Sequence, residues 1–155
     1  MRGGQLRLTQ ALLTSRVNPE RAFEYFEKAR LLLPGTLIEE AALRQIVVLA
    51  AKTSNRERFI KAAISYLSRF RRSAYVAGFE TQLAFHIVRF EGRDGLLILQ
   101  ELLKAHPQGW GRCVACFLAS VAEQAIIAGK IDLARTAAEA ALTFATDSSS
   151  EKQRA

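Results

Sequence analysis

Two cysteines, two histidines and one pair of adjacent carboxylates are the residues of this chain whose types could support chemistry. Cys113 and Cys116 have the CxxC spacing that activates a thiolate at the start of a helix in thioredoxin-like folds. No βαβ pattern surrounds them, and no second cysteine pair or suitably spaced histidine completes a zinc site. We therefore expect both cysteines to pack in or near the core. A disulfide in an oxidising compartment, or a metal or redox role, are the alternatives.

The other candidates lack the partner groups that a reaction would require. His86 lies four residues after Gln82 and three before Arg89, which would place three polar groups on one helix face. We favour a structural or solvated histidine there, with a groove contact as the alternative. Glu39 and Glu40 fall in the first turn of an expected helix, where carboxylates stabilise the helix dipole. The sequence thus supports no enzyme and no cofactor or metal site.

The elements that would position these residues recur at a spacing of about 37 residues, in the range of stacked-repeat proteins. Turns at Asn18, Asn55, Gly92 and Gly129 each precede an apolar-periodic segment. We therefore expect an all-α fold, a right-handed αα-hairpin solenoid of tetratricopeptide-like type with about eight helices in four hairpins. The full tetratricopeptide signature of Trp, Leu-Gly, Tyr and Pro positions is not present, so the likeness is to the hairpin alone.

Start and stop signals place the individual helices. We expect them over residues 5–15, 19–33, 37–52, 56 to about 72, 74–90, 95–105, 108–128 and 132–145. Four leucines should form the apolar face of the first helix: Leu6, Leu8, Leu12 and Leu13. Alanines should allow close helix contacts at Ala22, Ala29, Ala62, Ala63, Ala134, Ala137, Ala138 and Ala141. Trp110, between two glycines, is expected to fill a gap between repeats rather than form an exposed contact.

Composition and charge limit the other classes of function. Half of the 155 residues are apolar, and the expected organisation is one helical-repeat domain over residues 1–146 followed by a flexible polar tail over residues 147–155. The net charge of +7 is spread over all the helices, with Arg69, Arg71 and Arg72 as its only dense cluster, so a nucleic-acid partner is not favoured. No apolar run reaches the roughly 18 to 20 residues that a membrane span needs.

One run of residues resembles a known family. Residues 31–44, which read LLLPGTLIEEAALR, together with Arg58-Phe59, the segment 66–73 and Tyr75, are similar to the C-terminal half of the MotC family of rhizobia and related alphaproteobacteria. A weaker similarity extends over residues 126–135. The run from Pro34 to Arg44 is the specific part, because alanine-rich hairpins match many repeat proteins.

The resemblance implies a secreted, non-enzymatic motility protein of the periplasm. It implies a chaperone or assembly factor for the periplasmic part of the flagellar stator protein MotB, and it makes this chain a fragment of the family's full length. The family's secretion signal is not found in this sequence, so a periplasmic location follows from the resemblance alone. A helical solenoid suits the role, since its groove can hold a segment of a partner without chemistry.

Partner contacts are expected on the first helix of each hairpin, which usually lines the binding surface of such arrays. The polar positions there are Arg7, Gln10, Arg44, Gln45, Gln82, His86, Arg89, Glu123 and Gln124. A solvated face is the alternative interpretation for any of them. Two other functions stay open: a cytosolic tetratricopeptide-like adaptor, and, on charge alone, a nucleic-acid-binding repeat.

Overall fold

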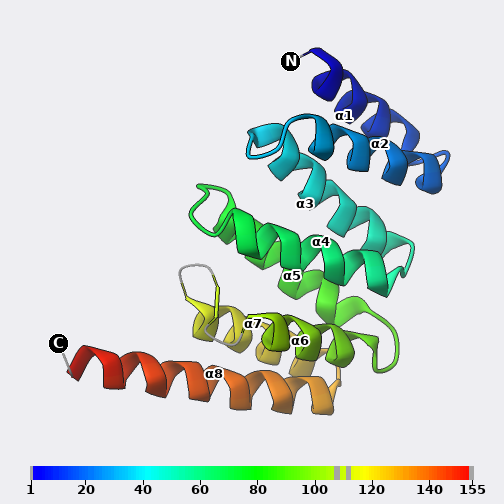
Figure 1. Ribbon diagram of the computed structural model, residues 1–155. Helices are drawn as coiled ribbons and strands as arrows, with labels where there is room; N and C mark the ends of the chain where they lie inside the picture. Colours follow the sequence, from blue (N-terminus) through cyan, green and yellow to red (C-terminus); the bar gives the residue numbers. More distant parts are fainter. Residues whose placement is uncertain (1, 107–108, 111–112, 154–155) are drawn as a thin grey trace. The chain divides into compact units, whose positions relative to one another are not determined.

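The computed structural model describes residues 2–106, 109–110 and 113–153 of the chain (Figure 1). This described part contains eight helices and no strand, which confirms the all-α class. The helices are α1 (Arg2–Thr14), α2 (Pro19–Leu32), α3 (Leu37–Lys52), α4 (Arg56–Arg69), α5 (Val76–Arg89), α6 (Asp94–Ala105), α7 (Val114–Ile127) and α8 (Ile131–Gln153). None of the described helices has the length and apolarity that crossing a membrane requires. The solenoid path and its right-handed sense stay predictions.

Side-chain caps fix where three of these helices begin. Asn18 accepts the backbone N–H of Arg21 at 3.1 Å at the start of α2, and Asn55 accepts that of Arg58 at 3.0 Å at the start of α4. Thr36 caps α3 through the N–H of Ile38. Each cap satisfies a donor that the first helical turn would leave without a partner, so the predicted starts of these helices are confirmed.

Left-handed residues close two of the turns between paired helices. Gly129 adopts a φ of 72° after α7, and the N–H of Lys130 donates to the carbonyl of Ala125 at 2.8 Å. Ser54 adopts a φ of 52° after α3, where the N–H of Asn55 donates to the carbonyl of Ala50 at 2.8 Å. Both turns are helix-ending motifs whose left-handed position favours glycine. In the turn after α3, this position is held by Ser54.

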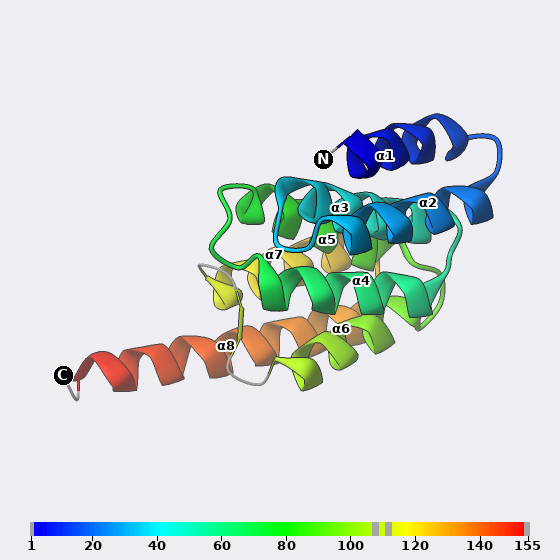
Figure 2. The ribbon, with the colours of Figure 1, turned by 45° about the horizontal axis from the view of Figure 1, so that its top comes forward.

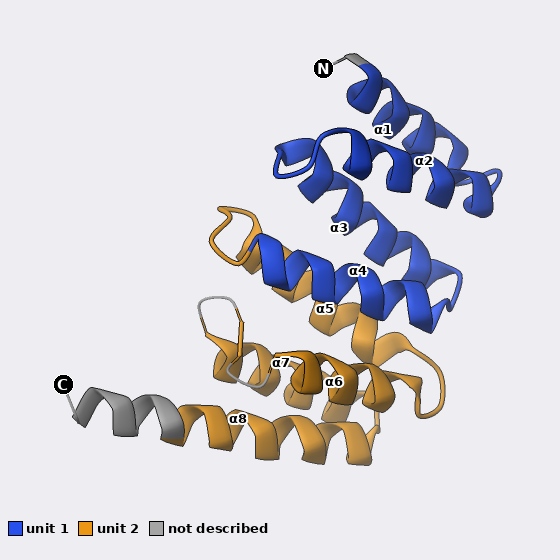
Figure 3. Ribbon diagram, viewed as in Figure 1, with its two compact units in different colours: residues 1–70 blue, residues 71–155 orange. Residues whose placement is uncertain are grey.

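The chain divides into two compact units, unit 1 (Met1–Phe70) and unit 2 (Arg71–Ala155), coloured separately in Figure 3. In unit 1, α1 packs on α2 and α3 packs on α4, and α3 also contacts both helices of the first pair. Figure 2 shows the turn that joins α3 to α4. The core of unit 1 is apolar, with Phe26, Phe59 and Tyr66 among its largest fully buried side chains. The single repeat domain expected for residues 1–146 stays a prediction.

Unit 2 repeats the pairing with α5–α6 and α7–α8, while α7 also packs on α5 and α8 on α6. Helices α5 and α6 approach closely at Gly95 on α6, where an added Cβ would lie 2.4 Å from the carbonyl oxygen of Ile87 on α5. Six of the eight alanines expected at helix contacts are buried in the two units, and the exceptions are Ala138 and Ala141.

The structure corrects several expected boundaries. Helix α7 begins at Val114, not near residue 108, because Gly109 adopts a φ of 81° and Trp110 is not helical. Helix α4 ends at Arg69, and α8 continues to Gln153 instead of ending near residue 145. The last two residues of the expected tail lie outside the described residues.

The leucine face expected for α1 is also wrong. The side chains of Leu6, Leu12 and Leu13 are exposed, whereas Gly4 and Ala11 are buried. Close packing of α1 on α2 explains the difference, because small residues permit the approach: a Cβ added at Gly4 would lie 2.6 Å from Leu33 Cδ1.

Candidate partner-binding groove

A groove of about 460 Å³ opens in unit 1 between α2 and α4. Leu43 and Ile46 of α3 form part of its apolar lining. Helix α2 contributes residues 23, 24, 27, 28, 30 and 31, and α4 contributes residues 58, 61, 62 and 65. These positions follow the i, i+3, i+4, i+7 spacing of one helix face, so each helix presents a continuous stripe to the groove.

Arg58 is held in place at the edge of this groove by two partners on α2. Its guanidinium lies 4.2 Å from the centroid of the Phe23 ring, and its Nη1 contacts both carboxylate oxygens of Glu20 at 2.8 and 3.0 Å. Stacking on an aromatic ring and pairing with a carboxylate fix the plane of an arginine side chain. The groove therefore has a pre-positioned cationic group.

The remaining lining combines both signs of charge with apolar surface. Glu24, Glu27 and Lys28 project from α2, where Arg30 also pairs with Glu27 at 2.6 Å, and Lys61 lies on α4. Leu31 lines the groove although its side chain is 68% exposed. An apolar floor with charged sides suits a short amphipathic segment of a protein better than a small polar molecule or a nucleic acid.

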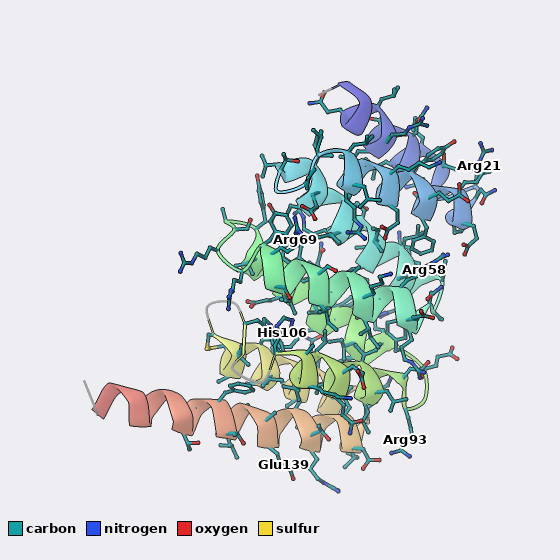
Figure 4. All side chains as sticks on the ribbon, in the orientation of Figure 1. Arg21, Arg58, Arg69, Arg93, His106 and Glu139 are labelled. Carbon is teal, nitrogen blue, oxygen red and sulfur yellow. A yellow bond between two sulfur atoms is a disulfide. The ribbon has the colours of Figure 1, made fainter. Side chains whose placement is uncertain are left out.

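Two buried carboxylates support the groove from the other end of α4. Glu39 is only 3% exposed, and its Oε2 accepts the N–H of Gly35 at 2.6 Å and Arg69 Nη2 at 2.9 Å. Glu40 is buried beside it and accepts the hydroxyl of Tyr66 at 2.6 Å. Figure 4 shows Arg58 and Arg69 near opposite ends of α4, so paired arginines anchor both ends of this helix.

The expected role of Glu39 and Glu40 is thus incomplete. They do stand in the first turn of α3, as the dipole argument requires. Their burial and their partners on α4 show that they also join the two helices of the pair.

The nine residues predicted to contact a partner all lie on the odd-numbered helices, as expected, but none of them lines the groove of unit 1. Arg7 donates to Gln10 at 3.1 Å and lies 5.7 Å from the ring centroid of Tyr25. Arg44 and Gln45 are half-buried on α3. In unit 2, Gln82, Arg89 and Glu123 are exposed, and His86 and Gln124 are half-buried. Their role in binding stays a prediction.

Sequence reasoning missed the groove because it favoured the first helix of each hairpin. The signal was present as matching stripes on the second helices, where charged and apolar residues repeat at helical spacing in both α2 and α4. From sequence alone, the same residues are equally consistent with solvated helix faces. Only their placement on either side of the groove distinguishes a binding surface from a solvated one.

The structure also corrects the prediction for the two cysteines. Cys113 and Cys116 are exposed and joined by a disulfide, so the expectation of core packing is wrong. Trp110 is 3% exposed and contacts the rings of His106 and Phe117 edge-on, which confirms the buried interpretation. Among the described residues, no group of three or more His, Cys, Asp or Glu side chains could hold a metal ion.

Residues 2–155 match a family model described as "Chemotaxis protein MotC". Over 141 residues, the chain is 36% identical to a protein of Rhizobium meliloti (strain 1021) named "Chemotaxis protein MotC". The match covers 90% of this chain and 31% of that relative, so the chain spans about a third of the relative's length. No solved structure matches the chain.

Proposed function

Because the chain belongs to the MotC family of chemotaxis proteins, we propose that it is a non-enzymatic protein-binding module of flagellar motility. The family is one of chemotaxis proteins and not of enzymes. The observation that carries the proposal is the groove of unit 1, with its apolar floor and its fixed Arg58. Such a groove binds a partner segment without changing it chemically.

The partner we propose is the periplasmic region of the stator protein MotB, for which the chain acts as a chaperone or assembly factor. An amphipathic segment of that region would place an apolar side chain against the exposed Leu31, above the buried Leu43 and Ile46, and its charges against Glu24, Arg58 and Lys61. Binding of this kind depends mainly on apolar burial, with charges that orient the segment. It should therefore survive high salt.

A periplasmic location is part of the proposal and has support in the chemistry of the cysteines. Disulfides persist in the bacterial periplasm, whereas the cytosol keeps most thiols reduced. The Cys113–Cys116 bond suits the oxidising compartment. Fractionation of cells that produce the natural full-length protein tests this point, and recovery with cytosolic markers would contradict it.

Calorimetric titration of the chain with the purified periplasmic region of MotB, at low and at high salt, tests the partner. A matched pair of variants locates the contact. Leu31→Asn changes an apolar residue in the groove, and Leu142→Asn changes a residue of α8 that is equally exposed, at 68%, and does not line the groove. We expect Leu31→Asn to weaken binding about tenfold, equal to about 1.4 kcal/mol, and Leu142→Asn to leave affinity unchanged.

The alternative binding site is the polar surface predicted on the odd-numbered helices. Alanine substitutions at Gln82, His86 and Arg89 should leave affinity unchanged if the groove of unit 1 holds the partner. Loss of affinity in these variants, with normal binding by Leu31→Asn, would place the site on unit 2. No saturable binding by the unmodified chain would refute MotB as the partner of this part of the family. A chaperone role further requires that the chain slow proteolysis of the MotB region.

A further inference from the structure

The disulfide at the start of α7 has features that the binding proposal does not use. Cys113 is the N-cap residue of α7, and its Sγ accepts the backbone N–H of Cys116 at 3.1 Å. A helix N-terminus and a donated hydrogen bond both stabilise a thiolate, so Cys113 is a good leaving group when the disulfide is attacked. Both cysteines are exposed, and exposed disulfides are the ones that external thiols reach.

A cavity of about 260 Å³ adjoins the disulfide within unit 2. Both cysteines line it, together with Phe117 and Ser120 of α7 and the short side chains of Ala77, Thr81 and Ala84 on α5. These small residues leave space beside the sulfur atoms for a short peptide segment that carries a cysteine. The cavity thus gives an attacking thiol a place to bind as well as a target.

Glu80 of α5 is the carboxyl group that lines the same cavity. Its Oε1 atom is buried and has no hydrogen-bond partner among the described residues. Burial raises the pKa of the Glu80 carboxyl above its ordinary value. A carboxyl group that keeps its proton to higher pH, beside reacting sulfur atoms, can carry a proton between them.

We propose that Cys113 and Cys116 form a thiol–disulfide exchange site that accepts two electrons from a dithiol of another protein. One thiolate of the dithiol attacks Cys116 Sγ and forms a mixed disulfide, while the Cys113–Cys116 bond breaks and its electron pair goes to Cys113 Sγ. The second thiol loses its proton and attacks the first sulfur of the dithiol. The bond to Cys116 then breaks, and Cys116 takes that electron pair and, through Glu80, the proton.

The products balance as one oxidised dithiol and one reduced cysteine pair: Cys113 leaves as a thiolate, and the proton that the first thiol lost on forming its thiolate goes to the solvent. Each chain accepts electrons once, so the exchange is stoichiometric and requires no catalytic turnover. The inference does not depend on MotB or on the groove of unit 1, and it can fail without affecting the binding proposal.

The test mixes the oxidised full chain with a reduced peptide that contains two cysteines and follows the loss of peptide thiols. We expect exchange faster than with oxidised glutathione at equal concentration, because the leaving thiolate is stabilised. Acid quenching and mass spectrometry should find the peptide attached to Cys116. Exchange no faster than with oxidised glutathione, or attachment to Cys113, would overturn the proposal.

A matched pair of variants tests the part played by Glu80. We expect Glu80→Gln to slow release of the peptide disulfide about 100-fold, the lower end of what a positioned acid–base group supplies. Glu139→Gln serves as the control, since it removes an exposed carboxylate of α8, labelled in Figure 4, that does not line the cavity. Equal rates for the two variants, with unchanged helical circular dichroism, would remove Glu80 from the mechanism.

Discussion

Replacing Arg69 with Met should destabilise the chain more than the exposure of Arg69 suggests. Arg69 Nη2 lies 2.9 Å from Glu39 Oε2, and the glutamate is 3% exposed whereas the arginine is 49% exposed. Breaking a fully buried pair costs about 3–5 kcal/mol, because the remaining charge stays buried. Here water reaches the arginine side, and the N–H of Gly35 still donates to the carboxylate. We therefore expect a loss of about 2 kcal/mol in the free energy of unfolding.

A double-mutant cycle with Glu39→Gln separates the pair from the packing of the arginine stem. The amide keeps an acceptor for Gly35 but removes the charge, so we expect the two substitutions together to cost about 1 kcal/mol less than their sum. Urea denaturation followed by helical circular dichroism measures each term, and equal m-values show that the same surface unfolds in every variant.

The second Arg–Glu pair of α4 provides the control for this cycle. Glu20 and Arg58 are also in contact, at 2.8 Å, but their side chains are 70% and 40% exposed. Pairs of this kind typically contribute about 0.2–1 kcal/mol. The coupling between Arg58→Met and Glu20→Gln should thus be smaller than that between Arg69 and Glu39. An equal or larger coupling for the exposed pair would refute the argument that burial of Glu39 sets the cost.

Three further predictions concern the turns, the close crossing and pH. Ser54→Gly should raise the free energy of unfolding by about 0.5–1 kcal/mol in urea denaturation, because Ser54 has a φ of 52° that glycine adopts without strain; a loss would contradict this. Gly95→Ala should lower it by about 1–3 kcal/mol, since its Cβ would meet the Ile87 carbonyl, and unchanged stability would refute the close approach. Burial raises the pKa of Glu80 above 4.5, so its contribution to stability is fully present below pH 4.5 and falls as pH rises through the raised pKa. Stability measured against pH should show this decline in the unmodified chain and not in Glu80→Gln.

The local signals of the sequence were sufficient for the helices and most of their ends. Caps such as Asn18, Asn55 and Thr36 act on backbone groups two or three residues away, so the sequence alone displays both partners. Glu39 and Glu40 have partners 30 and 26 residues away, and no local pattern pairs them with Arg69 and Tyr66. The sequence could therefore indicate only local roles for these two carboxylates.

The errors at α7 have a similar physical origin. The segment before Val114 looked compatible with a long helix, yet Gly109 takes a left-handed conformation in close contact with Val114 and the side chain of Phe144. This places Cys113 at the N-cap instead of inside a helix, while Cys116 lies in the first turn of α7, and both residues are exposed. The wrong expectation for the cysteines has another origin, because it followed from the frequent burial of free cysteines, whereas these two form a disulfide.

Some of the residues that carry the family resemblance stabilise unit 1, and others line the groove. Only substitutions of the second kind can report on partner binding. Glu39, Glu40, Tyr66 and Arg69 bind one another across α3 and α4, so changes there would reduce partner binding by destabilising unit 1. Leu31 and Arg58 belong to the same resembling segments but line the groove. Leu31 is exposed and has little packing to lose, so loss of affinity in Leu31→Asn without loss of stability can be assigned to the partner contact.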